Sequence, residues 1–565
     1  MKKIILILLG SAVTLAAYAQ SWQEALYFSE NTYGGTARSV GMGNALTAVG
    51  GDPGSLTFNP AGSAVAAYSQ LMITPGFTLS SVNATGVVLS ENNAAIGLGD
   101  NVNTLYGRMK LPNAGFILNI NTGSRSGLRR MSVGFVANQT ADYTSRINAH
   151  GVNGDNSYAA SRATSAEGFT EKVLGTEDWW YDGSDDSRKP YWEDMVAYRS
   201  GMINGVPDSR NVYQAVTELR DGNGNIWIAG PLYQKYGQQT TGGKHDMLLN
   251  FAMDFGDKFY IGANLGITTM RYALSEYWYE APENPSDFPE IEYTDGTHGK
   301  FQELTMKRNY RLNGTGVYFK AGFLWRPVAG LRIGAAFQTP TAMKFTARQA
   351  YAGETVITGK SIAASTSPED SWTYGMNNPY RVNAGLAYSF GSFAVLSADY
   401  EFVDYQSVRY KSPDSDWNTP TYLSDANLDI KDVLGSSHLV RVGLEVKPAS
   451  FLSVRAGYNF TSCPQKNWLT ENWETQPLTQ AEKSALAKHA FSLGLGTTFG
   501  SFYLDLAARM RLMPKDYIVT YNYYAYDDTK ADGYLNKFVD TGVITPEIEV
   551  KSTLVDILLT FGWRF

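Results

Sequence analysis

The side chains that could carry out covalent or metal chemistry are few and scattered along the chain. Five histidines lie far apart, without the spacing of metal ligands, and Cys463 is the only cysteine. Neither a G-x-S-x-G nucleophile elbow nor a phosphate-binding loop occurs. The sequence therefore predicts a protein that is not an enzyme and that uses neither a metal ion nor a cofactor.

Two glycine-rich stretches match only the beginnings of ligand-binding motifs. The stretch "VGMGNAL", from Val40, starts like a dinucleotide fingerprint but lacks the third glycine and the preceding strand. The stretch "DGNGN", from Asp221, starts like a calcium loop but lacks the later glycine and the glutamate at position twelve. A tight turn in an external loop is the simpler interpretation of the second stretch.

Several acidic and basic residues fall on one face of the segments that contain them. Buried charges need partners, so two interpretations are open. The charges form a compensating salt-bridge network, which would stiffen the fold and could use Arg38 as a partner, or they bind the carboxylate of a ligand. The inward-facing candidates are Asp399, Glu401, Arg441, Glu445, Arg455, Asp505 and Arg509.

These charges belong to segments in which apolar and polar residues alternate. Examples are "LVRVGLEVK", "FLSVRAGYNF", "SFYLDLAARMR" and the final "TLVDILLTFGWRF". Successive side chains of a strand point to opposite faces, so each segment has one apolar face and one mostly polar face. The pattern predicts an all-β protein, and it occurs both in soluble sandwiches and in membrane barrels.

The connections favour a membrane barrel, because short and long links alternate strictly. Outer-membrane barrels have short periplasmic turns and long external loops, whereas a soluble sandwich has no reason for this alternation. We therefore predict a fourteen-stranded antiparallel transmembrane β-barrel over residues 69–565. The strand candidates lie near 70–80, 112–121, 130–146, 245–256, 258–275, 312–327, 330–348, 379–390, 392–410, 436–448, 451–463, 487–499, 501–523 and 550–565.

The N-terminus and the composition agree with an exported protein. Lys2 and Lys3, an apolar run and Ala17-Tyr18-Ala19 predict a signal peptide over residues 1–19, with an uncleaved membrane anchor as the alternative. The net charge of −7 becomes −9 when the two lysines are removed, which argues against a nucleic-acid partner. A single cysteine excludes an internal disulfide framework.

Residues 20–68 precede the first predicted strand and are rich in Gly and Ala. Asn59 is a good helix N-cap and Pro60 suits the first helical position. Because a fourteen-stranded barrel is wider than an eight-stranded one, whose side chains alone can fill it, we expect this segment to be a small helical plug in the lumen. A periplasmic tail is the alternative.

The other end of the chain carries aromatic residues on one face of the last strand. These are Phe561, Trp563 and Phe565. They suit the aromatic girdle of a membrane barrel and resemble the C-terminal signal read by the barrel-assembly machinery.

Residues 37–64, "ARSVGMGNALTAVGGDPGSLTFNPAGSA", carry a resemblance to a known family. The segment resembles the plug of the FadL/TodX-type outer-membrane transporters of long-chain fatty acids and other hydrophobic compounds. Weaker matches occur at 378–390 and 398–405. The residues that match the family pattern are Arg38, Gly41, Gly43, Ala45, Asp52, Asn59, Pro60 and Ala61.

The resemblance implies capture of an apolar ligand outside, passage into the lumen and sideways exit through a gap beside a kinked third strand. That strand would be about 130–146, where Gln139 falls at an outward position after an apolar face. A bulge near Asn138 and Gln139 would turn the polar side chain inward and open the ladder. Alternatively, Gln139 lies in water near the external interface.

The predicted loop at 147–244 is the longest and departs from the family pattern. It contains Trp179, Trp180, Tyr181, Tyr191 and Trp192. Aromatic side chains bind apolar molecules, so the loop could collect ligand. It could equally be a self-packed domain.

Three functions are compatible with these features. The first is passive uptake of hydrophobic compounds such as long-chain fatty acids by a monomer in the outer membrane of a Gram-negative bacterium, with a hydrophobic small molecule and membrane lipid as partners. The second is a FadL-like structural or secretion-associated barrel that docks exported proteins. The third, an outer-membrane hydrolase, lacks a recognisable Ser/His constellation.

Overall fold

The structure is a computed structural model of the chain. It describes residues 20–87, 97–124, 126–176, 190–207, 209–221, 223, 225–292, 298–360, 363–412, 421–469, 474–526, 538–540, 543 and 545–565. The predicted signal peptide, residues 1–19, lies outside these ranges.

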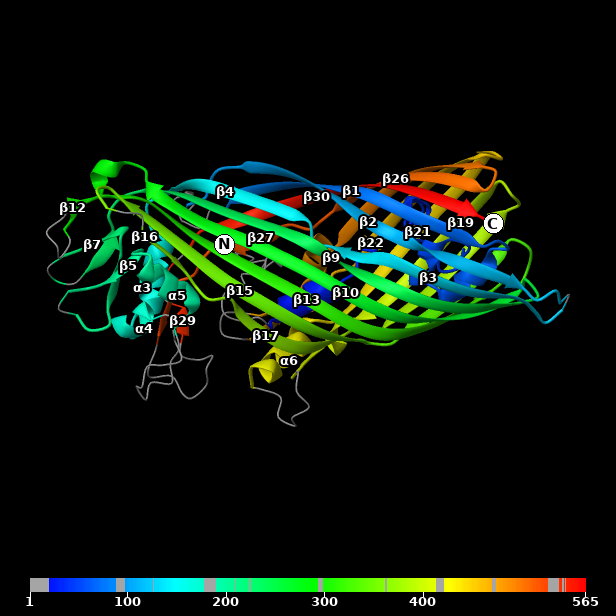
Figure 1. The fold of residues 1–565 in the computed structure, drawn as a ribbon, viewed down its shortest axis with the longest axis horizontal. Helices are drawn as coiled ribbons and strands as arrows, with labels where there is room; N and C mark the ends of the chain where they lie inside the picture. The colour runs from blue at the N-terminus through cyan, green and yellow to red at the C-terminus, as the bar shows by residue number, and fades with distance from the viewer. Residues whose placement is uncertain are drawn as a thin grey trace.

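Fourteen antiparallel strands form a closed barrel, which confirms the predicted fold class (Figure 1). The ring closes because β1 pairs with β2 on one side and with β30 on the other. In ring order the strands are β1 (Gln70–Gly86), β2 (Val102–Asn121), β3 (Leu128–Asp142) continued by β4 (Ser145–Asn153), β9 (Leu232–Phe255), β10 (Phe259–Pro282), β13 (Phe301–Trp325), β14 (Leu331–Gln338) continued by β15 (Thr341–Ile357), β18 (Arg381–Phe390) with β17 (Asp370–Asn378), β19 (Ala394–Asp404) continued by β20 (Arg409–Lys411), β21 (Ser436–Ala449), β22 (Leu452–Thr461), β25 (Lys488–Phe499), β26 (Phe502–Leu512) continued by β27 (Asp516–Val519), and β30 (Glu547–Arg564).

Proline explains three of the interruptions within these strands. Pro340 separates β14 from β15, Pro379 separates β17 from β18, and Pro514 lies between β26 and β27. Proline has no N–H to donate to a ladder, so the pairing stops there and resumes beyond it.

The outer face of the barrel is apolar, as the alternation predicted. Leu265, Phe319, Leu386, Leu444 and Phe491 are among the large apolar side chains exposed there. Their sequence neighbours point into the lumen, where polar and charged side chains are buried. Because the ring is closed it has no free first or last strand, and together with the apolar outer surface this meets the condition for crossing a bilayer with strands.

The helices within the described ranges are short. In the part of the chain that the structure describes, no helix is long and apolar enough to cross a membrane.

Several strands are longer than the sequence predicted. β9 begins at Leu232, β10 continues to Pro282 and β13 begins at Phe301. These strands therefore extend far beyond the ends of their neighbours at the end of the barrel that carries the long connections. We call this end the long-loop end, and the opposite end the short-turn end.

Small elements gather at the long-loop end (Figure 1). Tyr191 and Trp192 are described there, whereas Trp179, Trp180 and Tyr181 lie outside the described residues. The elements that connect or cover the barrel strands are α3 (Tyr158–Ala166), α4 (Glu171–Gly175), α5 (Trp192–Arg199), β5 (Ile203–Gly205), β6 (Tyr213–Ala215), β7 (Glu218–Arg220), β8 (Ile226–Ile228), η3 (Pro285–Asp287), β11 (Ile291–Glu292), β12 (His298–Gly299), β16 (Ala363–Thr366), η4 (Tyr405–Ser407), α6 (Thr421–Val433), β23 (Asn467–Leu469), β24 (Thr475–Pro477), α7 (Gln480–Ala485), β28 (Tyr524–Tyr526) and β29 (Phe538–Asp540).

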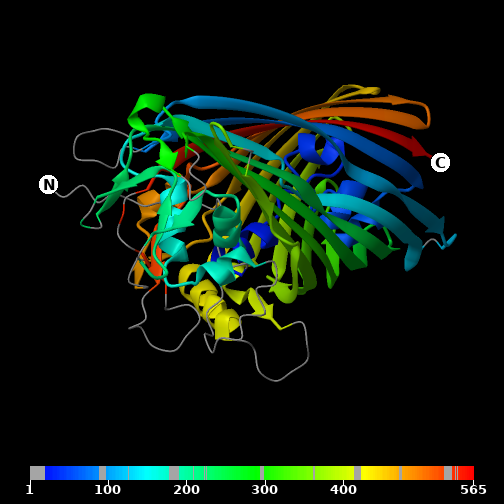
Figure 2. The same ribbon diagram turned by 60° about the vertical axis from the view of Figure 1, so that its left-hand side comes forward.

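The N-terminal segment lies inside the ring as a plug (Figures 1 and 2). It consists of α1 (Trp22–Ser29), α2 (Ala37–Gly41) and two 3-10 helices, η1 (Pro53–Thr57) and η2 (Pro60–Val65). Each begins with a side chain that accepts a backbone hydrogen bond, namely Ser21, Thr36, Asp52 and Asn59. Short helices without much propensity of their own are thus fixed by caps and by the surrounding wall.

Candidate functional site

Asn59 joins the plug to the barrel wall. Its Oδ1 accepts a hydrogen bond from the backbone N–H of Ala61 at 3.1 Å. Its Nδ2 donates to the carbonyl of Thr47 in the plug and to that of Phe323 on β13, both at 2.8 Å. Pro60 follows at the first helical position, where no N–H is needed. The Asn-Pro-Ala sequence therefore caps η2 and anchors it to the wall at once.

Glycines let the plug backbone touch the wall backbone. Gly43 has a φ of +60°, and a Cβ on it would lie 2.9 Å from the backbone nitrogen of Tyr458. On the wall side, a Cβ on Gly457 would lie 2.1 Å from the nitrogen of Gly43. Gly41 faces Gly494 in the same way, at 3.2 Å. Larger residues at these positions would separate the two surfaces.

Arg38 connects the plug to a chain of lumenal charges. Its guanidinium pairs with Glu445 at 2.9 Å, Glu445 pairs with Arg455 at 2.7 Å, and Arg455 pairs with Asp505 at 2.6 Å. Asp52 has a different role, because its Oδ1 accepts from Thr36 Oγ1 and from the N–H of Gly54, both at 2.8 Å. Burial raises the pKa of the Asp52 carboxyl.

A second group of charges surrounds Glu401, which is fully buried. Its carboxylate pairs with Arg441 and, at 3.0 Å, with Arg381, and it accepts a 2.6 Å hydrogen bond from the Tyr33 hydroxyl of the plug. Nearby, Asp399 accepts from the backbone N–H of Thr47 at 2.7 Å. These predicted residues therefore contact each other and the plug.

A third group centres on Asp556 of β30. Its carboxylate pairs with Arg509 at 2.9 Å, with Arg511 at 2.9 Å and with Lys110 at 2.7 Å. Arg509 also donates to the plug carbonyl of Tyr33 at 2.7 Å. The seven predicted lumenal charges are all buried and fall into these three groups, a geometry that fits the salt-bridge interpretation. In the described ranges, no group of three or more His, Cys, Asp or Glu residues could hold a metal ion.

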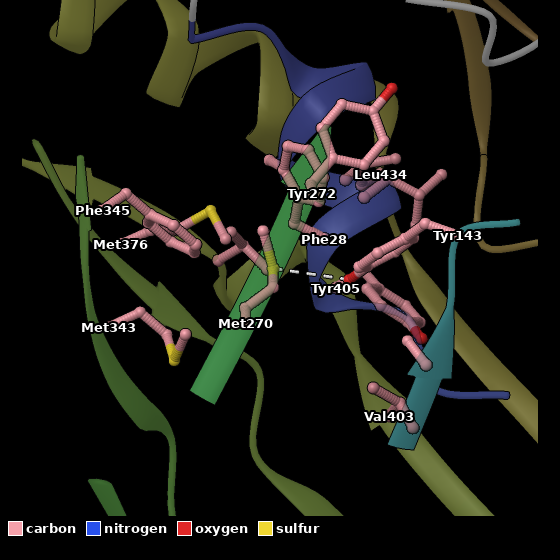
Figure 3. Close-up of a cluster of buried hydrophobic side chains, with 14 of the residues drawn as sticks. Phe28, Tyr143, Met270, Tyr272, Met343, Phe345, Met376, Val403, Tyr405 and Leu434 are labelled. Atoms are coloured by element: carbon pink, nitrogen blue, oxygen red, sulfur yellow. Dashed lines mark hydrogen bonds between the residues drawn. The ribbon is translucent and has the colours of Figure 1, made fainter. Parts of the chain in front are cut away.

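α1 packs into a cluster of buried apolar side chains inside the barrel, and we call the space that α1 occupies within this cluster the chamber (Figure 3). Phe28 packs edge-on against Tyr143 and Tyr272, with ring centroids 5.8 and 5.2 Å apart. The other side chains labelled in Figure 3 line the chamber: Met270, Met343, Phe345, Met376, Val403, Tyr405 and Leu434.

Polar groups hold α1 in the chamber. Glu24 is fully buried and accepts from the hydroxyls of Tyr374 at 2.5 Å and Tyr310 at 3.4 Å. Burial raises the pKa of the Glu24 carboxyl to about 8. At the other end of α1, Lys244 Nζ donates to the carbonyls of Phe28 and Glu30, both at 2.9 Å. A cation at the C-terminus of a helix stabilises it.

The ladder between β2 and β3 stops within the wall. The last pair is Asn113 with Asn138, although β2 continues to pair with β1 up to Val102. On its other side β3 stays paired with β9, with a register shift between Gln139 and Ala141. The Gln139 side chain is buried, with 5% exposure, rather than in water. The shift marks a bulge, the device that the sequence suggested for this place.

The plug takes over the hydrogen bonds that β2 leaves. The N–H groups of Thr32 and Tyr33 donate to the carbonyl of Thr140, and that of Gly34 donates to the carbonyl of Gln139 at 2.7 Å. Residues 32–34 therefore act as a short substitute strand along β3. Each unpaired backbone group in a nonpolar environment would cost several kcal/mol.

Beyond this point β4 lies against β1 and β2, and side chains bridge the space. Lys110 pairs with Asp142 at 2.8 Å, the guanidinium of Arg146 lies 4.7 Å from the ring of Tyr106, and Asn148 donates to Thr104 at 3.2 Å. A backbone bond returns where Asp100 donates to the carbonyl of His150 at 3.2 Å. We call the interval between residues 102–112 and 139–149 the slit.

The aromatic residues of the last strand lie on the outer face. Phe561, Trp563 and Phe565 are exposed, and the rings of Trp563 and Phe565 are 4.8 Å apart. Phe502 of the neighbouring strand stacks on Trp563 at 6.3 Å. They lie at the short-turn end, where an aromatic girdle would meet the membrane interface.

Sequence reasoning missed several residues of this site. Lys110 falls in a segment predicted to be a loop, and Tyr33 and Glu24 lie upstream of the matched motif. Asp556 sits on the polar face of the last strand, so its parity could have identified it as a lumenal charge.

Together, the ring, the plug and the lumenal charges define a plugged fourteen-stranded transmembrane β-barrel. No family model and no curated protein sequence matches this chain. Among solved structures, the chain is similar to a FadL homologue of Pseudomonas aeruginosa at 12% identity and a TM-score of 0.46, covering 94% of this chain and 98% of that one. The toluene transporter TodX of P. putida is similar at 11% identity and a TM-score of 0.45, covering 94% and 99%. The toluene transporter TbuX of Ralstonia pickettii is similar at 12% identity and a TM-score of 0.43, covering 94% and 98%.

Proposed function

We propose that this protein is an outer-membrane channel of a Gram-negative bacterium that takes up hydrophobic compounds passively and releases them sideways through the slit. The observation that carries the proposal is the interrupted β2–β3 ladder, in which carbonyls of β3 accept hydrogen bonds from the plug instead of from β2. The plug fills the lumen along the barrel axis, and the wall is interrupted beside it. This arrangement favours a lateral path for the transported compound.

The chamber and the slit are neighbours, which gives an apolar molecule a short route. Tyr143 follows Asp142 at the slit directly in sequence and packs against Tyr27 and Phe28 of α1. A compound that displaces α1 would therefore contact the inner side of the slit. The transfer of such a compound from water into the bilayer is favourable by about 25 cal/mol per Å² of apolar surface, so uptake as a whole requires no energy source.

The proposed outer-membrane location also bears on how the barrel is assembled. The exposed residues Phe561, Trp563 and Phe565 end the last strand. We propose that they serve as the signal for the barrel-assembly machinery, and that the mature channel acts as a monomer.

The test is uptake by proteoliposomes of a labelled long-chain fatty acid and of toluene. Asn59→Ala removes the cap of η2 and both hydrogen bonds of the amide, each worth about 1 kcal/mol. Uptake should fall severalfold because residues 32–34 lose their fixed position, while the barrel stays folded. Asn284→Ala is a matched control, because Asn284 caps η3 before Pro285 outside the lumen. Unchanged uptake of both compounds by Asn59→Ala, or absence of uptake by the unmodified protein, would contradict the proposal.

A further inference from the structure

Lys110 stands at the edge of the slit with no ladder partner on that side. It belongs to β2, where pairing with β1 continues at Gly76 while pairing with β3 has ended. Its ammonium contacts two carboxylates, Asp142 at 2.8 Å and Asp556 at 2.7 Å. The first lies across the slit and the second lies on the near side of it, on β30.

The charge of Asp142 depends on Lys110 for compensation more than the charge of Asp556 does. Among the described ion pairs, Lys110 is the only cation within salt-bridge distance of Asp142. Asp556 also has Arg509 and Arg511. The Asp142 carboxylate also lies 2.9 Å from the hydroxyl of Thr78 on β1, so it reaches beneath β2.

We propose that Lys110 is a latch: its pair with Asp142 holds the slit closed, and breaking that pair lets β3 and β4 move away from β2. This inference rests on the proposed lateral release, which it extends by naming the group that controls the opening. It differs from an ordinary lumenal ion pair because no backbone bonds support the two strands at this level.

The energetic reason lies in the surroundings of the pair. The side chains of Lys110 and Asp142 are 10% and 5% exposed. Removing one partner of a buried ion pair leaves an uncompensated charge, which is strongly destabilising. Without Lys110, Asp142 would also face Asp556 across the Thr78 hydroxyl, and like charges repel. Elsewhere in the barrel, backbone hydrogen bonds between neighbouring strands would resist this repulsion. At the slit only side-chain contacts resist it.

The first test measures the slit directly. Spin labels are placed at Met109 on β2 and Ser145 on β4 in a Cys463→Ser background, and their distance is measured in membranes. Lys110→Met and Asp142→Asn should each lengthen the mean distance between the labels, or broaden its distribution, by about one strand spacing, ~5 Å. Lys110→Arg keeps the charge and should restore the original distance.

Glu276→Gln serves as the matched control. Glu276 pairs with Arg308 at 3.3 Å inside the barrel, but between β10 and β13, whose ladder is continuous there. The distance between the labels should not change in this variant. If Lys110→Met and Asp142→Asn also leave the distance unchanged, the latch is overturned, whether or not the protein transports anything.

The second test asks whether opening serves release. In the proteoliposome assay, Lys110→Met should raise the uptake rate of the fatty acid or toluene severalfold. A thiol-reactive cross-link between Lys110→Cys and Asp142→Cys should lower the uptake rate severalfold. A widened slit without any uptake in any variant supports the latch and contradicts the proposed function. Normal uptake by the cross-linked protein contradicts release through the slit, whereas the distance measurement alone decides the latch.

Discussion

The backbone N–H of Gly34 in the plug donates to the carbonyl of Gln139 in the wall at 2.7 Å. The chain's own N-terminal segment thereby pairs with β3 at the point where β2 stops doing so. The plug and this part of the wall are consequently one hydrogen-bonded unit, because separating them would leave the carbonyls of Gln139 and Thr140 unpaired.

A wedge at Gly34 should separate the plug from the wall. A Cβ at this position would lie 3.1 Å from the carbonyl oxygen of Gln139 and 3.3 Å from Pro112. Gly34→Leu should break the hydrogen bond, at a cost of about 1–3 kcal/mol, and expose residues 20–36 to protease. Gly154→Leu, where a Cβ would contact nothing within 4 Å, should leave the cleavage rate unchanged. Equal cleavage of both variants would contradict this role of Gly34.

Arg38→Met should loosen the plug without unfolding the barrel. Glu445 would keep Arg455 as a partner, and the Arg38 side chain is 20% exposed. The loss should therefore lie below the 3–5 kcal/mol of a fully buried pair, at about 1–2 kcal/mol. The measurement is hydrogen exchange of the α2 amides. Arg348→Met, in an exposed pair with Glu369, should have no effect on them.

Docking of α1 should weaken as the pH rises. The pKa of Glu24 is about 8 when α1 is docked, against an ordinary value of 4.5, so docking binds a proton. The contribution of protonated Glu24 to the free energy of docking is complete below pH 4.5. It is lost as the pH rises toward 8, by up to about 1.36 kcal/mol for each pH unit. Hydrogen exchange of the α1 amides should therefore accelerate between about pH 5 and pH 8 by more than the intrinsic effect of pH on exchange.

Glu24→Gln should abolish this excess pH dependence, because an amide can accept the same hydroxyl hydrogen bonds without ionising. Glu171→Gln on the external helix α4 should retain it. A steep excess dependence that persists in Glu24→Gln would assign the titration to another group.

Gly43 should tolerate no side chain. Gly43→Val would place a β-branched residue at a φ of +60° and against the backbone of Tyr458, at a cost of about 1–3 kcal/mol in strain before any clash. The plug should detach, which would appear as loss of protection at Arg38 and its neighbours in limited proteolysis. Gly391→Val also has a positive φ, +60°, but no atom within 4 Å of a Cβ. It should show the strain alone, with the plug still protected.

Whether a residue of the site could be predicted depends on how far along the sequence the relevant pattern extends. Alternation along β26 identified both Asp505 and Arg509 as inward-facing, because the period of a strand is a local property. Asn59 and Pro60 could likewise be read as a helix start from their neighbours. The extension of β9 to Leu232 was not visible, since polar residues replace the alternation where the strand leaves the membrane region.

Residue patterns and connection lengths were sufficient to predict the number of strands, their apolar and polar faces, the closed ring and a compact segment before the first strand. Each of these depends on patterns within a few residues or on the lengths of connections. The contacts between charges and the interruption of the wall became visible only in the folded barrel. Lys110 finds Asp142 and Asp556 at separations of 32 and 446 residues. Such contacts depend on how the ring closes around the plug, and no local preference of the chain specifies that.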